Sequence, residues 1–344
     1  MIGEIIMRIK ASIEKVPGGM MVVPLFFGAL INTLFPNTAT YFGGFTGALL
    51  TGTASILAVF FFCVGATIDV KQSGYIAKKG LTLLIGKVVF AALLGYAAAL
   101  ILPENGIQTG IFSGLSALVL IAAFNETNGG LYTALMTKLG RTEDAAAFPF
   151  ISIESGPFFT MIILGVGGLA TFPWQTIVST LIPFVVGMIV GNIDKECRAF
   201  FGQAVPVLIP FFALALGFGL DFGMIIKSGF MGILMGVAVV FLSGGVLYVL
   251  DRYVTGSDGV AGVAASSTAG AAVAVPFIIA ELNPQFAPVA ESATAIIATS
   301  VLVTAILTPM LTMWVAKVQE KRGIPQRRYK KTTVTPGPSV RKVQ

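Results

Sequence analysis

Six residues, Asn125 to Gly130 (NETNGG), interrupt an apolar segment that runs from residue 111 to residue 136. In lipid, a carboxylate, two amides and a hydroxyl cost free energy unless they are hydrogen-bonded or serve a function. The glycines favour a break in the helix, which frees N–H groups at the start of one half-helix and C=O groups at the end of the other. Because the former attract anions and the latter attract cations, the segment predicts a site for a small polar solute and favours an anion.

Few ionisable side chains lie inside apolar segments, and three of them, Lys87, Glu126 and Glu154, lie well within one. Desolvation disfavours the charged form of a carboxyl group, so a buried glutamate can bind and release a proton as access alternates between the two sides of a membrane. We expect Glu154 to carry this coupling proton, with Glu126 as the second candidate. The alternative role for Glu154 is a hydrogen bond that braces the kink at Gly156-Pro157. Lys87 could pair with a substrate carboxylate or with Glu154, but we favour a side chain that extends to the nearer cytoplasmic face.

The residue types exclude several other chemistries. The chain has no histidine and only two cysteines, which excludes His-based metal sites, Ser-His or Cys-His catalysis and a disulfide framework. We therefore predict no catalytic residue, no metal site and no cofactor. The formal charge of +6 could suggest nucleic acid, but nine of the 22 basic residues lie beyond Val315, next to the last apolar segment. A cytoplasmic membrane anchor is the simpler interpretation, and no nucleic-acid partner is expected.

These residues must be positioned by membrane-spanning helices. Of the 344 residues, 56% are hydrophobic and 11% are charged, and the mean hydropathy of +0.90 is that of an integral membrane protein. The apolar segments are about 20 residues long, which favours α-helices over the roughly 10-residue alternating strands of a β-barrel. Charges, prolines and glycines divide the chain into ten predicted spans, at residues 17–35, 45–68, 80–102, 110–137, 144–168, 174–192, 203–222, 229–250, 258–281 and 288–316.

The distribution of basic residues predicts the orientation of these spans. With ten spans and a cytoplasmic N-terminus, 20 of the 22 basic residues, Arg8 and Lys79 among them, fall on the cytoplasmic side, as the positive-inside rule requires. The exceptions are Lys87, inside the third span, and Lys227, in an outer loop. The N-terminal segment superficially resembles a signal peptide, but no small-residue cleavage pattern follows, so we expect it to be retained. Both termini are therefore predicted to be cytoplasmic, with a basic, disordered tail over residues 317–344.

The ten spans can be compared as two halves of five, residues 1–168 and 174–316. Because five is odd, equivalent helices would run in opposite directions across the membrane. Inverted repeats of this kind are typical of secondary transporters, whose sites lie near the midplane on discontinuous helices. Short motifs recur in the same order in the two halves: Pro24–Gly28 and Pro183–Gly187 in spans one and six, Gly65–Asp69 and Gly217–Asp221 in spans two and seven, and Glu154-Ser155 and Glu291-Ser292 in spans five and ten.

The repeat predicts that span nine is interrupted where span four is. Span nine contains the polar run Ser266 to Gly270 at its centre, and aligning Gly130 with Gly270 places the two polar segments at equivalent positions. For the second segment alone, close helix packing is an equally good explanation. Two crossing interruptions would form one site, and the residues that we predict to bind substrate there are Asn125, Thr127, Asn128, Gly129, Ser266, Ser267 and Thr268.

Five stretches, which span nearly the whole chain apart from the tail, carry a family resemblance: Ser12–Leu30, Thr127–Tyr132, Glu154–Gly165, Val207–Gly217 and Gly259–Pro276. Together they resemble the 2-keto-3-deoxygluconate permease family, bacterial inner-membrane carriers within the bile-acid, arsenite and riboflavin transporter superfamily. The resemblance implies proton-coupled uptake of 2-keto-3-deoxygluconate, a six-carbon keto sugar acid. It also implies a core domain that holds the crossed fourth and ninth helices, and a panel domain that moves against it.

The leading hypothesis is a proton-coupled secondary transporter for a sugar-acid anion, with that anion and membrane lipid as its partners. A sodium-coupled organic-anion symporter of the same fold is the nearest alternative. A passive channel could also use matched interruptions as a filter, but it would not need a titratable group at the site. An intramembrane enzyme could use Glu126 and Glu154 as paired acids, but the sequence contains no nucleophile elbow or HExxH motif. The sequence does not specify the oligomeric state or the preferred keto sugar acid.

Overall fold

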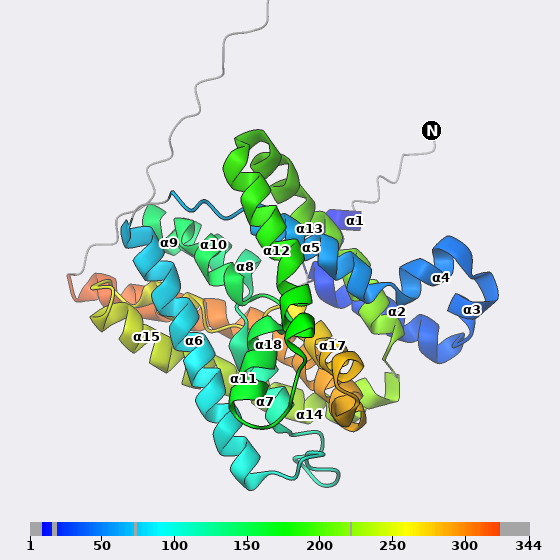
Figure 1. The fold of residues 1–344 in the computed structure, drawn as a ribbon. Helices are drawn as coiled ribbons and strands as arrows, with labels where there is room; N and C mark the ends of the chain where they lie inside the picture. Colours follow the sequence, from blue (N-terminus) through cyan, green and yellow to red (C-terminus); the bar gives the residue numbers. More distant parts are fainter. Residues whose placement is uncertain (1–8, 16–18, 72–73, 221, 324–344) are drawn as a thin grey trace, which may run out of the picture.

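The computed structural model describes residues 9–15, 19–71, 74–220 and 222–323, and within them it contains helices and their connections but no strand (Figure 1). The all-helical class predicted from composition is confirmed for this part of the chain. Arg8, Asp221 and residues 324–344, which make up most of the predicted tail, lie outside the described residues.

Among the described residues, five helices are long and apolar enough to cross a membrane. Each contains at least the roughly 20 residues that span a hydrocarbon core of about 30 Å. One of them includes a π-helical turn, η2, that joins α14 to α15 without a break. The five are α6 (Gly74–Ile101), α12 (Trp174–Ile193), α13 (Lys195–Phe218), α14 (Phe222–Ala238) with η2 (Val239–Ser243) and α15 (Gly244–Tyr253), and α18 (Ala287–Lys321).

Two further apolar segments, each predicted as one span, are bent, and a kink was expected from sequence only in the second, at Gly156-Pro157. One bends by 67° across Gly52 and the other by 58° across Ser155 and Gly156. Gly156 has a φ of +99°, which glycine adopts without strain, and Pro157 then fixes the first turn of the next helix. The elements concerned are α4 (Gly44–Thr51) and α5 (Thr53–Ala66) at the first bend, and α9 (Thr142–Ala146), α10 (Phe148–Ile151), η1 (Ser152–Glu154) and α11 (Pro157–Val166) at the second.

Both predicted interruptions are present. In span four, α7 (Ala117–Asn125) ends and α8 (Gly129–Leu139) begins after three non-helical residues. In span nine, α16 (Val260–Ala264) ends and helical structure resumes at η3 (Ala271–Ala274), which continues into α17 (Val275–Leu282). Span four begins later than predicted, because residues 102–116 form a turn-rich connection instead of helix.

Helices α2 (Gly19–Leu34), α5, α12 and α13 pack mainly on one another. Two of these contacts depend on glycine, because a Cβ atom at Gly28, Gly217, Gly65 or Gly187 would lie 2.2 Å or less from a backbone oxygen of the facing helix. Gly28 and Gly217 join α2 to α13, whereas Gly65 and Gly187 join α5 to α12. The predicted repeat equates span one (α2) with span six (α12), and span two (α5) with span seven (α13). Under this repeat, the contact between α2 and α13 corresponds to the contact between α12 and α5.

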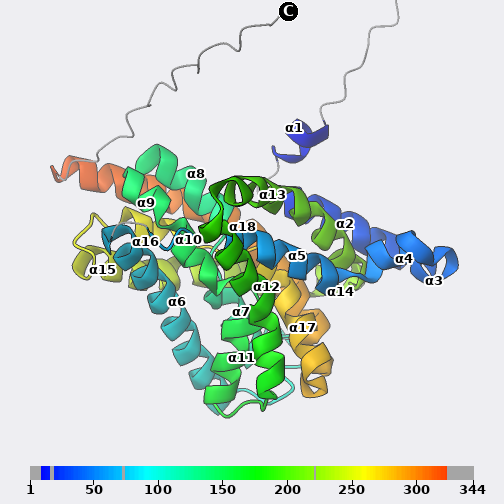
Figure 2. The same cartoon turned by 45° about the horizontal axis from the view of Figure 1, so that its top comes forward.

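The remaining long helices surround the interruptions. In both views α2, α4 and α5 lie on one side of the molecule and α6 and α15 on the other, with α7 between them, while α18 runs from the middle of the molecule to the side of α15 (Figures 1 and 2). Helix α7 contacts α6, α11 and α18, and α16 contacts α15 and α18. Helix α18 continues to Lys321, five residues beyond the predicted end of span ten, because lysine and glutamate are good helix formers and extend the helix past its apolar part.

Candidate functional site

The two interruptions lie against each other and satisfy part of each other's backbone. Ala269 N–H donates to the carbonyl oxygen of Glu126 at 3.1 Å, and Asn128 N–H donates to Ser267 Oγ at 3.0 Å. Thr268 Oγ1 donates to the carbonyl oxygen of Ala123 at 3.1 Å. Non-helical backbone at membrane depth requires such partners, because no water is available to replace them. We call this contact between residues 123–130 and 265–270 the crossing.

The Lys87 side chain extends from α6 into the crossing. Its side chain is buried, with 1% of its surface exposed. The ammonium group lies 2.6 to 3.1 Å from four oxygens: the carbonyls of Glu126, Ala265 and Ser267, and Thr127 Oγ1. The interpretation that we favoured from sequence, a lysine extending to the cytoplasmic face, is therefore wrong. The ammonium group has three hydrogens to donate, and the interruptions leave carbonyl oxygens that can accept them. A side chain that extended toward the cytoplasmic face would pass between packed helices instead of reaching these acceptors.

Two buried carboxyl groups flank the crossing. Glu154, which is 1% exposed, accepts a short hydrogen bond from Thr127 N–H through Oε1, whereas its Oε2 has no partner among the described residues. Neither carboxyl oxygen of Glu126 has a hydrogen-bond partner in this part of the chain, and the Gly156 amide faces that group without reaching hydrogen-bond geometry. Neither glutamate forms an ion pair with Lys87 in the described structure. Both carboxyl groups are thus buried at the crossing and lie outside the ion pairs of the described structure.

A cavity of about 520 Å³ opens beside the crossing. Its polar end is the start of α8, where Asn128 caps the helix by accepting from Leu131 N–H at 3.1 Å. The N–H groups of Gly129 and Gly130, in the same turn, donate to no acceptor among the described residues. Its apolar wall comes from α2, α5 and α13, and its lining includes Met21, Phe60, Phe212, Thr127, Asn128, Gly129, Gly130 and Ser155.

All seven residues predicted to bind substrate lie at the crossing, but they have different surroundings. Thr127, Asn128 and Gly129 line the cavity. The other four are turned to neighbouring helices and do not line it: Asn125 donates to Thr160 Oγ1 at 3.4 Å, Ser266 donates to its own helix at Val263, and Ser267 and Thr268 bond across the crossing. Sequence reasoning did not select Lys87, Gly130 or Ser155 for the site. The sequence did offer a signal for Gly130 and for Ser155, because they directly follow Gly129 and Glu154, which had been selected.

Comparison with known proteins identifies the family. A family profile described as 2-keto-3-deoxygluconate permease matches residues 10–321, which include every residue of the crossing and the cavity. The chain belongs to the 2-keto-3-deoxygluconate permease family. The resemblance found in the sequence is confirmed, and membership of a permease family makes the chain a transport protein and not an enzyme.

Several members of the permease family are close in sequence. A 2-keto-3-deoxygluconate permease from Bacillus subtilis (strain 168) is 64% identical over 321 residues, which cover 93% of this chain and 97% of the relative. Proteins of the same name from Enterobacter sp. (strain 638) and Escherichia coli (strain K12 / DH10B) are 52% and 50% identical, over 90% and 92% of this chain and 94% and 97% of their own lengths.

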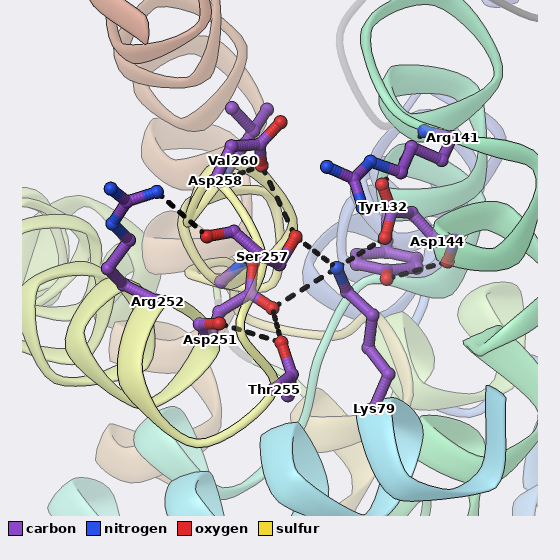
Figure 3. A network of polar contacts seen from close by, with 11 residues as sticks. Lys79, Tyr132, Arg141, Asp144, Asp251, Arg252, Thr255, Ser257, Asp258 and Val260 are labelled. Carbon is purple, nitrogen blue, oxygen red and sulfur yellow. Dashed lines mark hydrogen bonds and ion pairs between the residues drawn. The ribbon is translucent and has the colours of Figure 1, made fainter. Parts of the chain in front are cut away.

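Away from the crossing, this family member also contains a cluster of buried ion pairs, drawn in Figure 3. Lys79 of α6 pairs with Asp144 of α9 and, at 3.1 Å, with Asp251 of α15, and it donates to Ser257 Oγ at 2.8 Å. The three charged side chains are fully buried. Asp251 also accepts from Gly262 N–H at 3.1 Å. The cluster ties the first turns of α6 to α9, α15 and α16. No group of three histidine, cysteine, aspartate or glutamate side chains in the described chain could hold a metal ion.

Proposed function

We propose that this permease is a secondary active transporter that takes up 2-keto-3-deoxygluconate, or a closely similar sugar-acid anion, together with protons by alternating access. The observation that carries the proposal is a pair of N–H groups, at Gly129 and Gly130, that have no acceptor among the described residues and lie at a cavity next to two buried carboxyl groups. The relatives named 2-keto-3-deoxygluconate permease supply the substrate. A sodium-coupled organic-anion symporter of the same fold is the alternative.

In this proposal the substrate carboxylate binds at the start of α8. Free N–H groups and the positive end of a helix dipole favour an anion at that position. The cavity of about 520 Å³ is within the usual range for small-molecule sites, roughly 300–1,000 Å³. Asn128 and Ser155 would bind the substrate's hydroxyl and keto groups, whereas Asn125, Ser266, Ser267 and Thr268 would hold the crossing in shape.

Glu154 carries the coupling proton in this proposal, with Glu126 as the second candidate. Support comes from three carboxyl oxygens that have no partner among the described residues, Glu154 Oε2 and both oxygens of Glu126, since an ionised carboxylate with too few hydrogen bonds is costly in a bundle interior and protonation removes that cost. Glu154 also accepts a hydrogen bond from Thr127 N–H, two residues before Gly129. The carboxyl group proposed to bind the proton and the N–H groups proposed to bind the anion therefore lie beside the same short segment of backbone.

The orientation and the moving parts complete the proposal. We assign the permease to the bacterial inner membrane, with ten spans, both termini in the cytoplasm, and residues 1–168 and 174–316 as inverted halves. The group of α2, α5, α12 and α13 would be the panel domain that moves against the helices around the crossing. Support comes from the basic residues, of which 20 of 22 fall on one predicted side, and from the glycine contacts that the repeat exchanges.

The test is counterflow of labelled 2-keto-3-deoxygluconate in proteoliposomes with an imposed pH gradient. We expect counterflow without a gradient and accumulation against a concentration gradient when the outside is acidic. Accumulation that ignores the pH gradient but follows a sodium gradient would favour the sodium-coupled alternative. If no keto sugar acid is exchanged, the proposed substrate is wrong.

A further inference from the structure

We propose that the Lys87 ammonium group is a built-in cation of the crossing: it occupies the oxygen-lined position that a free monovalent metal ion would otherwise fill, and so makes transport independent of sodium. The part of this inference that concerns coupling rests on the proposed transport function. The part that concerns cation binding can be measured without any substrate.

The coordination of the ammonium group supports this role. Three of its four oxygen neighbours are backbone carbonyls, at 3.0 Å (Glu126), 2.9 Å (Ala265) and 2.6 Å (Ser267), and the fourth is Thr127 Oγ1 at 3.1 Å. Carbonyl and hydroxyl oxygens of this kind also replace the hydration shell of alkali-metal ions in proteins. Two of the oxygens come from each interruption, so the position is built by the crossing itself.

The electrostatics of the two interruptions require a positive charge at this point. Helix α7 ends at Asn125 and α16 ends at Ala264, and the carbonyls of the next residues, Glu126 and Ala265, both point at the Lys87 ammonium group. The C-terminal end of a helix carries a partial negative charge. Two such ends that converge in a buried site repel each other unless a cation lies between them.

The Lys87 ammonium group is not placed to bind substrate. It is surrounded by oxygens of the protein, and Lys87 does not line the cavity at the start of α8. A charge that is attached to α6 also stays in the protein throughout the transport cycle. The ion that moves with the substrate must then be held by other groups, which leaves Glu154 and Glu126.

Two substitutions separate the charge from the space that it fills. Lys87→Ala removes the ammonium group and leaves room for a metal ion among the same oxygens. Lys87→Met removes the charge but fills the space with an apolar side chain of similar length. Lys78→Ala, at the exposed neighbour of Lys79 on the same helix, is the matched control. Each protein is purified in sodium chloride, and its thermal midpoint is then compared in sodium chloride and in choline chloride of equal concentration.

We expect sodium to raise the midpoint of Lys87→Ala by about 4 °C or more, because a ligand that binds only the folded state stabilises it. The wild type, Lys78→Ala and Lys87→Met should differ by less than about 1 °C between the two salts. Lys87→Ala should also require sodium for counterflow of 2-keto-3-deoxygluconate. An equal response of Lys87→Ala and Lys87→Met to sodium would overturn the proposal, as would no response in either.

A measurement on the wild type keeps the proposal falsifiable if Lys87→Ala cannot be recovered. Uptake by wild-type proteoliposomes should agree within about twofold in sodium and in choline, and a several-fold stimulation by sodium would contradict a built-in cation. Failure of the transport proposal would look different. In that case the wild type would not exchange 2-keto-3-deoxygluconate in either salt, while the sodium-dependent midpoint of Lys87→Ala would be unaffected.

Discussion

Lys79 and Lys87 lie on one helix, α6, and both are almost completely buried, yet their charges are balanced in different ways. They are eight residues apart, which corresponds to about 12 Å along the helix axis. Lys79 is paired with two aspartates and a serine hydroxyl. Lys87 has no carboxylate partner in the described structure and is held by carbonyl dipoles and one hydroxyl.

The difference separates a cluster of paired charges from a site whose carboxyl groups lie outside the ion pairs of the described structure. At Lys79 the aspartates are neutralised by an ion pair, so protonating either of them would break a bond that joins α6 to α9 or α15. At Lys87 the dipoles of two helix ends supply the negative potential, and Glu126 and Glu154 take part in no ion pair among the described residues. Under the proposed function, a proton that binds to either carboxyl group would therefore break no salt bridge of the described structure.

The largest effect expected is the loss of the Lys79 cluster. Lys79→Met leaves Asp144 and Asp251 buried without a cation, and breaking a buried pair in this way costs about 3–5 kcal/mol. The thermal midpoint in detergent should fall by roughly 10 °C, while Lys78→Met, at an exposed position, should leave it unchanged. Adding Asp144→Asn and Asp251→Asn to Lys79→Met should recover much of the loss. A fall below about 2 °C would remove the contrast between the two lysines.

The second effect is on coupling beside Lys87, near the middle of α6. Glu154→Gln keeps an oxygen that can accept from Thr127 N–H but cannot bind a proton, so accumulation driven by a pH gradient should fall by on the order of tenfold or more. Counterflow without a gradient should persist, because exchange needs no net proton movement. The control is Glu143→Gln, at an exposed position on α9. If accumulation persists in Glu154→Gln, the proton is carried elsewhere, and Glu126→Gln becomes the next variant to measure.

The sequence was sufficient to predict features that depend on local chemistry. NETNGG and SSTAG combine polar side chains with glycine, which disfavours a helix wherever the segment lies, and both interruptions were found. The bend at Gly156 follows in the same way from a glycine before a proline. The bend at Gly52 was not predicted. Most glycines in membrane helices only permit close packing, and nothing in the sequence distinguishes a glycine at a bend from the others.

The partners of the two lysines could not be predicted. Lys87 binds backbone carbonyls, which every residue has, so no side-chain pattern identifies them. Lys79 was counted among the basic residues of the cytoplasmic side, and its partners Asp144 and Asp251 are far from it in the sequence. Residue type also did not reveal the direction of the side chains: Ser266 to Thr268 were predicted to bind substrate, but whether such side chains face the cavity or a neighbouring segment depends on tertiary packing.

A smaller effect is expected at the polar end of the cavity. Asn128→Ala removes the cap of α8, an interaction worth about 1 kcal/mol, and loosens the turn that holds the N–H groups of Gly129 and Gly130. The KM for 2-keto-3-deoxygluconate should rise about fivefold with little change in the pH dependence of uptake. Thr137→Ala, at an exposed position on the same helix, is the control. A change in the pH profile instead of KM would place Asn128 with the coupling groups.

The smallest effect is expected at an ion pair that is open to solvent. Asp69, after α5, pairs with Arg198 of α13, and the two side chains are 26% and 19% exposed. A hydrogen bond from Lys71 N–H, together with the Arg198 guanidinium, lowers the pKa of Asp69. Because the pKa is lower in the folded state, the pair stabilises the protein above the unfolded-state pKa of about 3.9, and this contribution is lost as the pH falls through the folded-state value.

Asp69→Asn should therefore cost only about 0.5 kcal/mol, since solvent screens the pair. The difference in thermal midpoint between wild type and variant should be constant from about pH 7 to about pH 5 and should shrink below about pH 4. Glu104→Gln, another exposed acid, is the control. A loss as large as that expected for Lys79→Met would mean that exposure does not distinguish these ion pairs. The buried Lys79 cluster would then owe its stabilising effect to the helices that it joins and not to its isolation from water.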